Sequence, residues 1–109
     1  MKKRAVALHL VEKGLYSENL KPRPGVPGEW DTGNWWISDS SAKELVGKNI
    51  HLHPGQKKQS HLGGEIISYV NFTGDRKRKI FHFRELVDCK GIGTPKEGWS
   101  NEKKIVWDK

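Results

Sequence analysis

The chain has one cysteine, Cys89, among its 109 residues. This excludes an intramolecular disulfide and a zinc site made of cysteine thiolates. A protein without disulfides is typical of a reducing compartment, so we expect a cytoplasmic location. The sequence also lacks an apolar stretch of the roughly 20 residues that span a bilayer. We therefore expect no membrane partner.

The N-terminal segment has a basic start and a short apolar run, but it lacks the other parts of a secretory signal. His9 and Glu12 interrupt the run, and no cleavage site of small residues follows. There is no internal repeat, and 109 residues suffice for one domain with a single modest core. We expect residues 1–109 to form one domain whose first strand covers residues 5–11.

Acidic residues are in the minority: 13 Asp and Glu stand against 20 Lys and Arg, which gives a net charge of +7. Hydrophobic residues make up only 34% of the chain, so the five Trp and three Phe must supply much of the core. A basic balance favours an anionic partner such as nucleic acid. Solubility alone is the alternative explanation of the charge.

The pattern of apolar and β-branched residues predicts short strands separated by turns. The expected strands cover residues 5–11, 34–38, 48–53, 64–70, 79–87 and 103–107. Ser41 and Glu44 match a capping box, which predicts a helix of about two turns that ends at Gly47. Residues 16–32 contain three prolines and no periodicity, so we expect a long loop there. These elements favour an α+β fold, a small mixed β-barrel with one or two short helices.

Successive side chains of a strand point to opposite faces of a sheet, so the expected strands also predict burial. Trp35 and Trp36 cannot both be core residues of a one-sided sheet. Phe81, Phe83 and Val87 share a face that we expect to be buried.

The same rule applies to the two strands on either side of residues 54–64. If His51 and His53 face outward, the intervening Ile50 and Leu52 face the core. In the following strand one face carries Glu65, Ile67 and Tyr69, and the other carries Ile66, Ser68 and Val70.

The loop at residues 54–64 is the strongest candidate for a binding site, because it joins two expected strands and concentrates hydrogen-bond donors. Its donors are Gln56, Lys57, Lys58, Gln59, Ser60 and His61. The two lysines can bind phosphates while the other four residues recognise a base edge. Gly63 and Gly64 permit the close approach of a backbone or a ligand. An ordinary solvated loop is the alternative interpretation.

Tryptophan residues are the second candidate, because a base stacks on an indole ring for about 1–3 kcal/mol. Trp35, Trp36 and Trp30 are the expected stacking residues. The basic run at residues 75–79 lies at an expected hairpin, where Arg76 and Arg78 would contact phosphates. A solvated hairpin tip explains this run equally well.

Three histidines raise the question of a metal site. His51 and His53 are two residues apart on a strand, and His61 could supply a third imidazole. No carboxylate accompanies them as an orienting partner. We expect neither a metal nor a cofactor.

The sequence has no nucleophile elbow and no other recognised acid–base signature. If the protein is an enzyme, Glu65 and Lys57 would form its acid–base pair. A simpler interpretation is that Glu65 is a strand residue paired with a nearby lysine. We therefore expect a protein without catalytic activity.

Four segments follow one another in a recognisable order: WWIS, the helix SSAKELVG, the strand KNIHLHP and the strand GGEIISYV. This layout resembles the PUA-like superfamily, including its EVE and ASCH branches. The resemblance implies a pseudobarrel that binds RNA or a modified base in DNA. The EVE branch implies an aromatic-walled cleft, which Trp35 or Trp36 would form. The ASCH branch includes hydrolases of modified nucleosides, but this chain lacks the Gly-x-Lys-x-x-Glu-x-Arg pattern of that branch.

These observations predict a nucleic-acid-binding module that reads a modified or flipped base in an aromatic cleft. One alternative is a small hydrolase of a modified nucleoside. Another is an interaction domain whose exposed tryptophans dock a protein partner. A nucleic-acid binder is distinguished from both by an affinity that falls steeply with salt.

Overall fold

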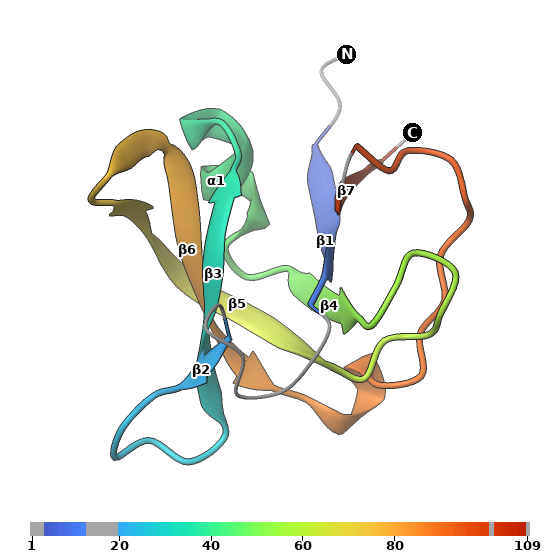
Figure 1. Ribbon diagram of the computed structural model, residues 1–109, viewed down its shortest axis with the longest axis horizontal. Coiled ribbons are helices and arrows are strands. Elements are labelled where there is room, and N and C mark those ends of the chain that lie inside the picture. Colours follow the sequence, from blue (N-terminus) through green and yellow to red (C-terminus); the bar gives the residue numbers. More distant parts are fainter. Residues whose placement is uncertain (1–3, 13–19, 101, 109) are drawn as a thin grey trace.

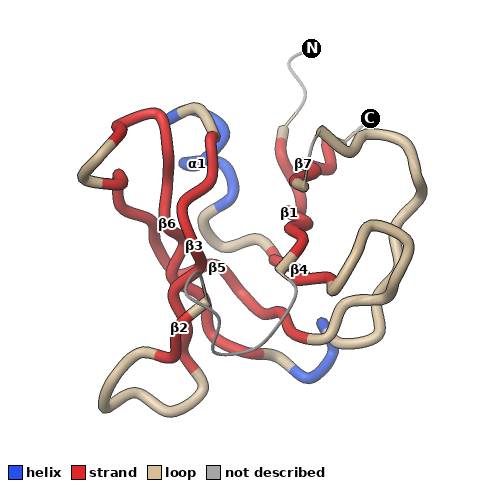
Figure 2. Tube along the Cα trace, viewed as in Figure 1, coloured by secondary structure: helices blue, strands red, loops and turns tan. Residues whose placement is uncertain are grey.

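The computed structural model describes residues 4–12, 20–100 and 102–108. The elements are β1 (Ala5–Val11), β2 (Lys21–Pro22), β3 (Glu29–Trp36), α1 (Asp39–Leu45), β4 (Asn49–His53), β5 (Leu62–Phe72), β6 (Asp75–Glu85), the 3₁₀ helix η1 (Val87–Cys89) and β7 (Lys103–Trp107) (Figures 1 and 2). Within the described residues, no helix is long and apolar enough to cross a membrane.

All seven strands belong to one mixed sheet with the order β2-β3-β6-β5-β4-β1-β7. β1 and β4 are parallel, and the other neighbouring strands are antiparallel. The sheet bends so that β3 and β6 lie on one side of the molecule and β1 and β7 on the other (Figure 1). Within the described residues the two ends of the sheet do not pair with each other. The expected mainly β fold with a helix is confirmed, but the sheet is not closed into a barrel by backbone hydrogen bonds.

The core fills the inside of this bend. Its buried residues come mainly from β1, β3, β4, β5, β6 and α1, and include Leu8, Leu10, Trp30, Ala42, Leu45, Ile50, Leu52, Ile66, Phe81 and Phe83. The predicted burial of Phe81 and Phe83 is confirmed. Val87 is 78% exposed, so its predicted burial is wrong. The alternation stops because β6 ends at Glu85 and the chain turns into η1.

The helix begins earlier than the capping-box pattern predicted. Its N-cap is Ser38, whose Oγ accepts a hydrogen bond from the Ser41 backbone N–H at 3.2 Å. Glu44 accepts instead from the Ala5 backbone N–H at 2.9 Å, and so ties α1 to β1. The capping box at Ser41 is therefore wrong, while the predicted end near Gly47 is confirmed by the left-handed φ of 87° at that residue.

The faces of β4 differ from the expectation for a one-sided sheet. Ile50 and Leu52 are buried as predicted, but His51 and His53 are buried too. The predicted outward orientation of the histidines is wrong because the segment before β7 covers this face. The ring of Trp99, for example, lies edge-on to His53 with 5.7 Å between centroids.

A β-bulge changes the alternation in β5. The register with β6 shifts between Ile66 and Ser68, so the faces predicted for residues 64–70 are wrong beyond this point. Ile66 is buried and Tyr69 packs against the same core, whereas Ile67 is partly exposed. The extra residue of a bulge moves every later side chain to the other face.

The expected loop at residues 16–32 is shorter in the structure. Residues 16–19 lie outside the described residues. Lys21–Pro22 forms β2, and β3 begins at Glu29 rather than near residue 34. Long-range pairing with β6 extends β3 through a stretch whose local sequence has no strand pattern.

Candidate functional site

Side chains join the two sides of the bent sheet where its backbone does not. The Lys103 Nζ atom, at the start of β7, donates a hydrogen bond to the Trp36 carbonyl at the end of β3. The same ammonium lies 5.0 Å from the centroid of the Trp36 ring, within the range of a cation–π interaction. We call this junction between β3 and β7 the seam.

A cavity of about 270 Å³ opens at the seam, and we call it the seam pocket. It is lined by Trp35, Trp36, Arg78, Ser100, Glu102 and Lys103. Burial lowers the pKa of Lys103, and the positive charge of Arg78 lowers it further. Two cations, one carboxylate and two indole rings thus surround one small space.

A second cavity of about 590 Å³ shares Trp36 with the seam pocket, and we call it the helix pocket because it reaches α1. Its lining is Trp36, Ile37, Ser38, Asp39, Asn71, Lys77 and Lys79. Lys79 is buried and its ammonium lies 3.0 Å from the Asp39 carboxylate. Lys77 is exposed, so its charge faces solvent at this cavity.

Trp36 stands between the two pockets and is 57% exposed. Trp35, the next residue, packs against the core. The prediction that these neighbours point to opposite faces is therefore confirmed. Arg78 lies opposite Trp36 in the β3–β6 register, where its guanidinium donates to the Asn34 side chain at 3.2 Å.

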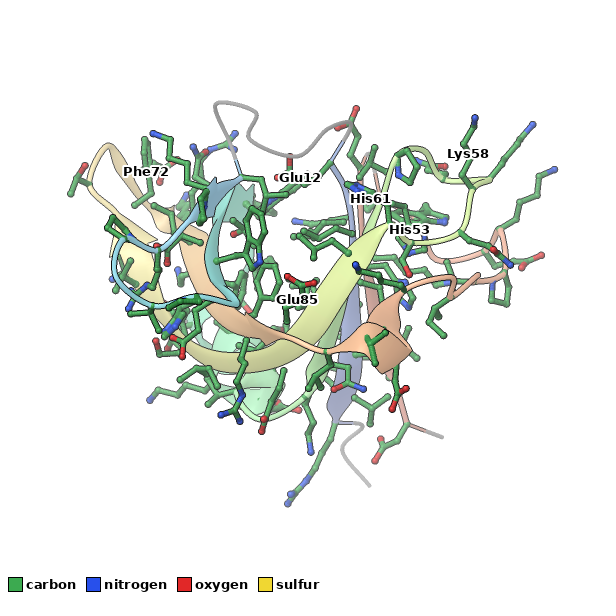
Figure 3. The ribbon with its side chains drawn as sticks, turned by 90° about the horizontal axis from the view of Figure 1, so that it is seen from below. Glu12, His53, Lys58, His61, Phe72 and Glu85 are labelled. Carbon is green, nitrogen blue, oxygen red and sulfur yellow. The ribbon has the colours of Figure 1, made fainter. Side chains whose placement is uncertain are left out.

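Trp30 is the one predicted stacking residue that belongs to the core. It is 8% exposed, and its indole N–H donates to Glu85 Oε1 at 3.0 Å; Figure 3 labels Glu85 on the inner side of the sheet. A buried ring with a bonded N–H offers no open face to a base, so we do not retain Trp30 in the site.

The loop at residues 54–61 uses two of its predicted donors internally. Ser60 is buried, and its hydroxyl donates to the Cys89 carbonyl at 2.6 Å and accepts from the Ile92 N–H at 3.0 Å. The His61 Nε2–H donates to the Glu12 carbonyl at 2.7 Å. The exposed part of the loop is the run Gln56, Lys57, Lys58 and Gln59.

This loop and the β5–β6 hairpin lie toward opposite sides of the molecule. Lys58 and Phe72, the latter beside the β5–β6 hairpin, appear toward opposite ends of the molecule in Figure 3. Among the described contacts, none joins Lys57 or Lys58 to Arg78. The side chain of Arg76 lies outside what the structure describes.

The proposed acid–base pair is not brought together either. Glu65 Oε1 accepts from the Arg84 guanidinium at 3.0 Å across β5 and β6. Among the described contacts, none joins Glu65 to Lys57. Gly63 and Gly64 serve close packing: a Cβ atom on Gly64 would lie 1.8 Å from the Arg84 carbonyl oxygen.

Three buried histidines cluster together, and Trp99 covers them. We call this cluster the histidine end; its members are His9, His51, His53 and Trp99. His53 Nδ1–H donates to the Lys58 carbonyl at 2.8 Å, so its Nε2 accepts from His9 Nδ1–H at 2.7 Å. The rings of His9 and His51 stack with 4.7 Å between centroids.

Burial lowers the pKa of all three histidines; the charges of His51 and His53 lower that of His9 further, and the charge of His61 lowers that of His53. For His9 the pKa falls from 6.5 to about 3. The imidazoles are therefore neutral at physiological pH. Within the described residues no group of three His, Cys, Asp or Glu could hold a metal ion.

Sequence reasoning missed Lys103 and Lys77 as site residues. Lys103 and Trp36 are 67 residues apart in the sequence. No local sequence pattern predicts a contact over that separation. Lys77 belongs to the basic run at residues 75–79. This run was predicted to contact phosphates, but only through its two arginines.

Comparison with protein-family models, with curated proteins and with solved structures finds no match for this chain.

Proposed function

We propose that the protein binds nucleic acid at the seam, with an unpaired or extruded base stacked on Trp36. A PUA-like pseudobarrel, in which the seam is the unclosed side, is the fold that we propose for this role. The order of strand, helix and strand between Trp35 and His53 supports it, as does the bend of the sheet.

The exposed indole of Trp36 carries the proposal. An aromatic ring that is 57% exposed between two cavities loses little of its own packing when a base covers it. Stacking on such a ring is worth about 1–3 kcal/mol per base. Lys103 covers part of the ring through its cation–π contact, so the base would stack on the remaining surface.

Phosphates have three cations available around the same tryptophan. Lys77 lines the helix pocket, and Arg78 and Lys103 line the seam pocket. Arg78 can bind a phosphate through two parallel hydrogen bonds. The net charge of +7 adds a general attraction to polyanions.

The test is a titration of fluorescein-labelled single-stranded and double-stranded oligonucleotides, followed by anisotropy at low and moderate salt. Base-modified duplexes would be included because a modified base is more easily extruded. We expect saturable binding that weakens with salt, together with quenching of tryptophan fluorescence. Trp36→Ala should reduce the affinity about tenfold or more, as expected for the loss of one stacked base.

Trp107→Ala is the matched control. Trp107 is also exposed, lies on β7 and lines neither pocket. Equal losses from the two substitutions would contradict the proposal, as would the absence of binding at low salt. A lack of nucleic-acid binding would leave the exposed tryptophan as a docking residue for a protein.

A further inference from the structure

Three polar side chains form a hydrogen-bonded chain across three neighbouring strands of the sheet. Ser68 belongs to β5, His82 to β6 and Glu29 to β3 (Figure 1). The Ser68 hydroxyl lies 3.3 Å from His82 Nδ1, and His82 Nε2 lies 2.5 Å from Glu29 Oε1. A hydroxyl, an imidazole and a carboxylate in this order form the arrangement that activates a serine nucleophile. The proposed function uses none of these residues.

The carboxylate of Glu29 determines the roles of the two imidazole nitrogens. An ionised carboxylate only accepts hydrogen bonds, so His82 Nε2 carries the proton that it donates to Glu29. In the neutral imidazole Nδ1 then holds the lone pair, and it accepts from the Ser68 hydroxyl. His82 is thus oriented as a base toward Ser68, and Glu29 stabilises the imidazolium that forms when the proton moves.

The β-bulge in β5 places the Ser68 hydroxyl beside this base. Regular alternation would put Ser68 on the same face as the buried Ile66. The register shifts between these two residues, and beyond the shift Ser68 is exposed and lies opposite His82. Tyr69, the next residue, packs against the core instead. The bulge therefore turns a serine that would be buried into one that reaches solvent and the imidazole together.

A cavity of about 390 Å³ adjoins the three residues, and we call it the sheet pocket. Its lining includes Lys21, Arg23, Asp31, Val70, Phe72 and Ile80. Val70 and Ile80 are the next pair on this face of the β5–β6 register after Ser68 and His82. Two residues along a strand span about 7 Å, so a molecule in the sheet pocket would lie beside the Ser68 hydroxyl.

The sheet pocket offers apolar surface and positive charge to a substrate. Its volume lies within the roughly 300–1,000 Å³ of small-molecule pockets. Val70, Phe72 and Ile80 provide the apolar surface, which suits a short acyl chain. Arg23 is paired with Asp31 at 3.1 Å, whereas Lys21 is exposed. Positive charge favours the oxyanion that develops when a serine attacks a carbonyl group.

We propose that Ser68 is a catalytic nucleophile that hydrolyses carboxylic esters of short acyl chains. His82 is its general base and acid, and Glu29 is a positioning residue that holds the imidazole. The activity does not depend on the binding of nucleic acid at the seam. The sequence shows no signature of it because the three residues come from three separate strands.

The reaction takes place in two steps. In the first, Ser68 Oγ bonds to the ester carbonyl carbon while its proton passes to His82 Nδ1; the bond to the alcohol oxygen then breaks, and His82 gives that oxygen the proton. In the second, water attacks the acyl carbon and gives a proton to Nδ1, and the bond to Oγ breaks as Oγ takes that proton. The products are an alcohol and a carboxylic acid, and Ser68 is regenerated.

A fluorophosphonate probe, which phosphonylates activated serines, tests the nucleophile directly. We expect one adduct, located on Ser68 by mass spectrometry of its peptides, and no adduct in Ser68→Ala. Ser40→Ala is the matched control, because Ser40 is also exposed but its hydroxyl lies 3.3 Å from that of Ser38 rather than near an imidazole. This control should react like the wild type. The absence of an adduct on the wild type, or an adduct that persists in Ser68→Ala, would overturn the proposal.

Hydrolysis of p-nitrophenyl acetate and butyrate tests the other two residues. His82→Gln should lower kcat about 100-fold or more, as expected for the loss of a general base. Glu29→Gln should lower kcat about tenfold or more while KM and the melting temperature stay unchanged. Glu97→Gln, at an exposed loop residue, should leave kcat unchanged.

The variants also separate catalysis from a structural role. A fall in the melting temperature of Glu29→Gln that accounts for its loss of activity would overturn the positioning role, as would an unchanged kcat. If His82→Gln does not fold, the adduct on Ser68 and the kcat of Glu29→Gln still decide. Ser68→Ala should bind oligonucleotides as the wild type does, so this proposal and the proposed function fail independently.

Discussion

The seam and the histidine end both combine aromatic rings with basic or titratable groups, but they use them in opposite ways. At the histidine end His9 and His53 hydrogen-bond to each other, His53 also hydrogen-bonds to the Lys58 carbonyl, and Trp99 packs edge-on against both rings. At the seam Trp36 stays exposed beside the cations that line its pockets. Residue types that look equivalent in the sequence thus become scaffold in one region and a candidate binding surface in the other.

The covering segment at the histidine end is itself held by a cation. Lys104 Nζ donates to the Thr94 hydroxyl and to the Pro95 carbonyl, both at 2.8 Å. The neighbouring Lys103 instead reaches the seam and contacts Trp36. Two adjacent lysines in β7 therefore serve the two regions, because alternate side chains of a strand point to opposite faces.

The largest effect should come from breaking the close backbone packing of β5 against β6, on which both regions are built. A Cβ atom on Gly64 would meet the Arg84 carbonyl oxygen at 1.8 Å, so the strands must move apart. We expect Gly64→Ala to lower the free energy of unfolding by about 3 kcal/mol, measured by urea denaturation. Gly55→Ala, where nothing lies within 4 Å, is the control; equal stability of the two variants would contradict the close packing.

Acid should weaken the histidine end first. The pKa of His9 is about 3 in the folded protein and 6.5 in the unfolded chain. Between these values the unfolded chain binds more protons, so the free energy of unfolding falls as the pH drops below 6.5 and is independent of His9 above it. The slope owed to His9 approaches about 1.4 kcal/mol per pH unit.

Urea denaturation at a series of pH values measures this slope. His9→Gln keeps a donor for His53 and removes the titration, so its stability should depend less on pH by that amount. An unchanged slope would show that His9 already takes up its proton in the folded state.

Removing one pair of charges at the seam and a matched pair in the loop tests which of these two surfaces binds phosphates. Lys77→Ala/Arg78→Ala removes two positive charges near Trp36, and Lys57→Ala/Lys58→Ala removes two from the loop at residues 54–61. We expect the first pair to lower the slope of log affinity against log salt by about 2 in magnitude, and to weaken binding by about 2 kcal/mol at low salt. The second pair should leave both nearly unchanged. The reverse order would move the binding surface to the loop.

The smallest effect should separate stability from binding at Ser60. Its hydroxyl joins the loop to residues 89–92 through two hydrogen bonds. Ser60→Ala should lower the free energy of unfolding by about 1 kcal/mol, read from thermal melts, with no change in oligonucleotide affinity. Thr73→Ala, at an exposed turn, is the control. A loss of affinity without a loss of stability would return Ser60 to the binding site.

Several parts of the fold could be predicted because their signals are local. The first and last strands match their predicted bounds, and the helix ends near Gly47. The opposite orientations of Trp35 and Trp36 follow from strand geometry alone. Alternation, turn residues and glycine conformations all act over a few positions, so the chain displays them directly.

Other parts depend on contacts that local patterns do not contain. The bulge near Ile66 is set by pairing with β6, and the burial of His51 and His53 is set by a segment about 45 residues away. The helix cap is Ser38 rather than Ser41, and Glu44 binds Ala5 in β1 rather than closing a capping box. In each case tertiary contacts outweighed a valid local signal.

The sequence by itself determined that this protein has short strands, one helix, a strong positive charge and more tryptophan than a small core requires. Tertiary structure decided which of these residues face solvent. Strand periodicity and charge act locally, whereas the seam forms only when Trp36 and Lys103 meet from distant parts of the chain. The bend of the sheet creates that meeting, and with it the candidate site.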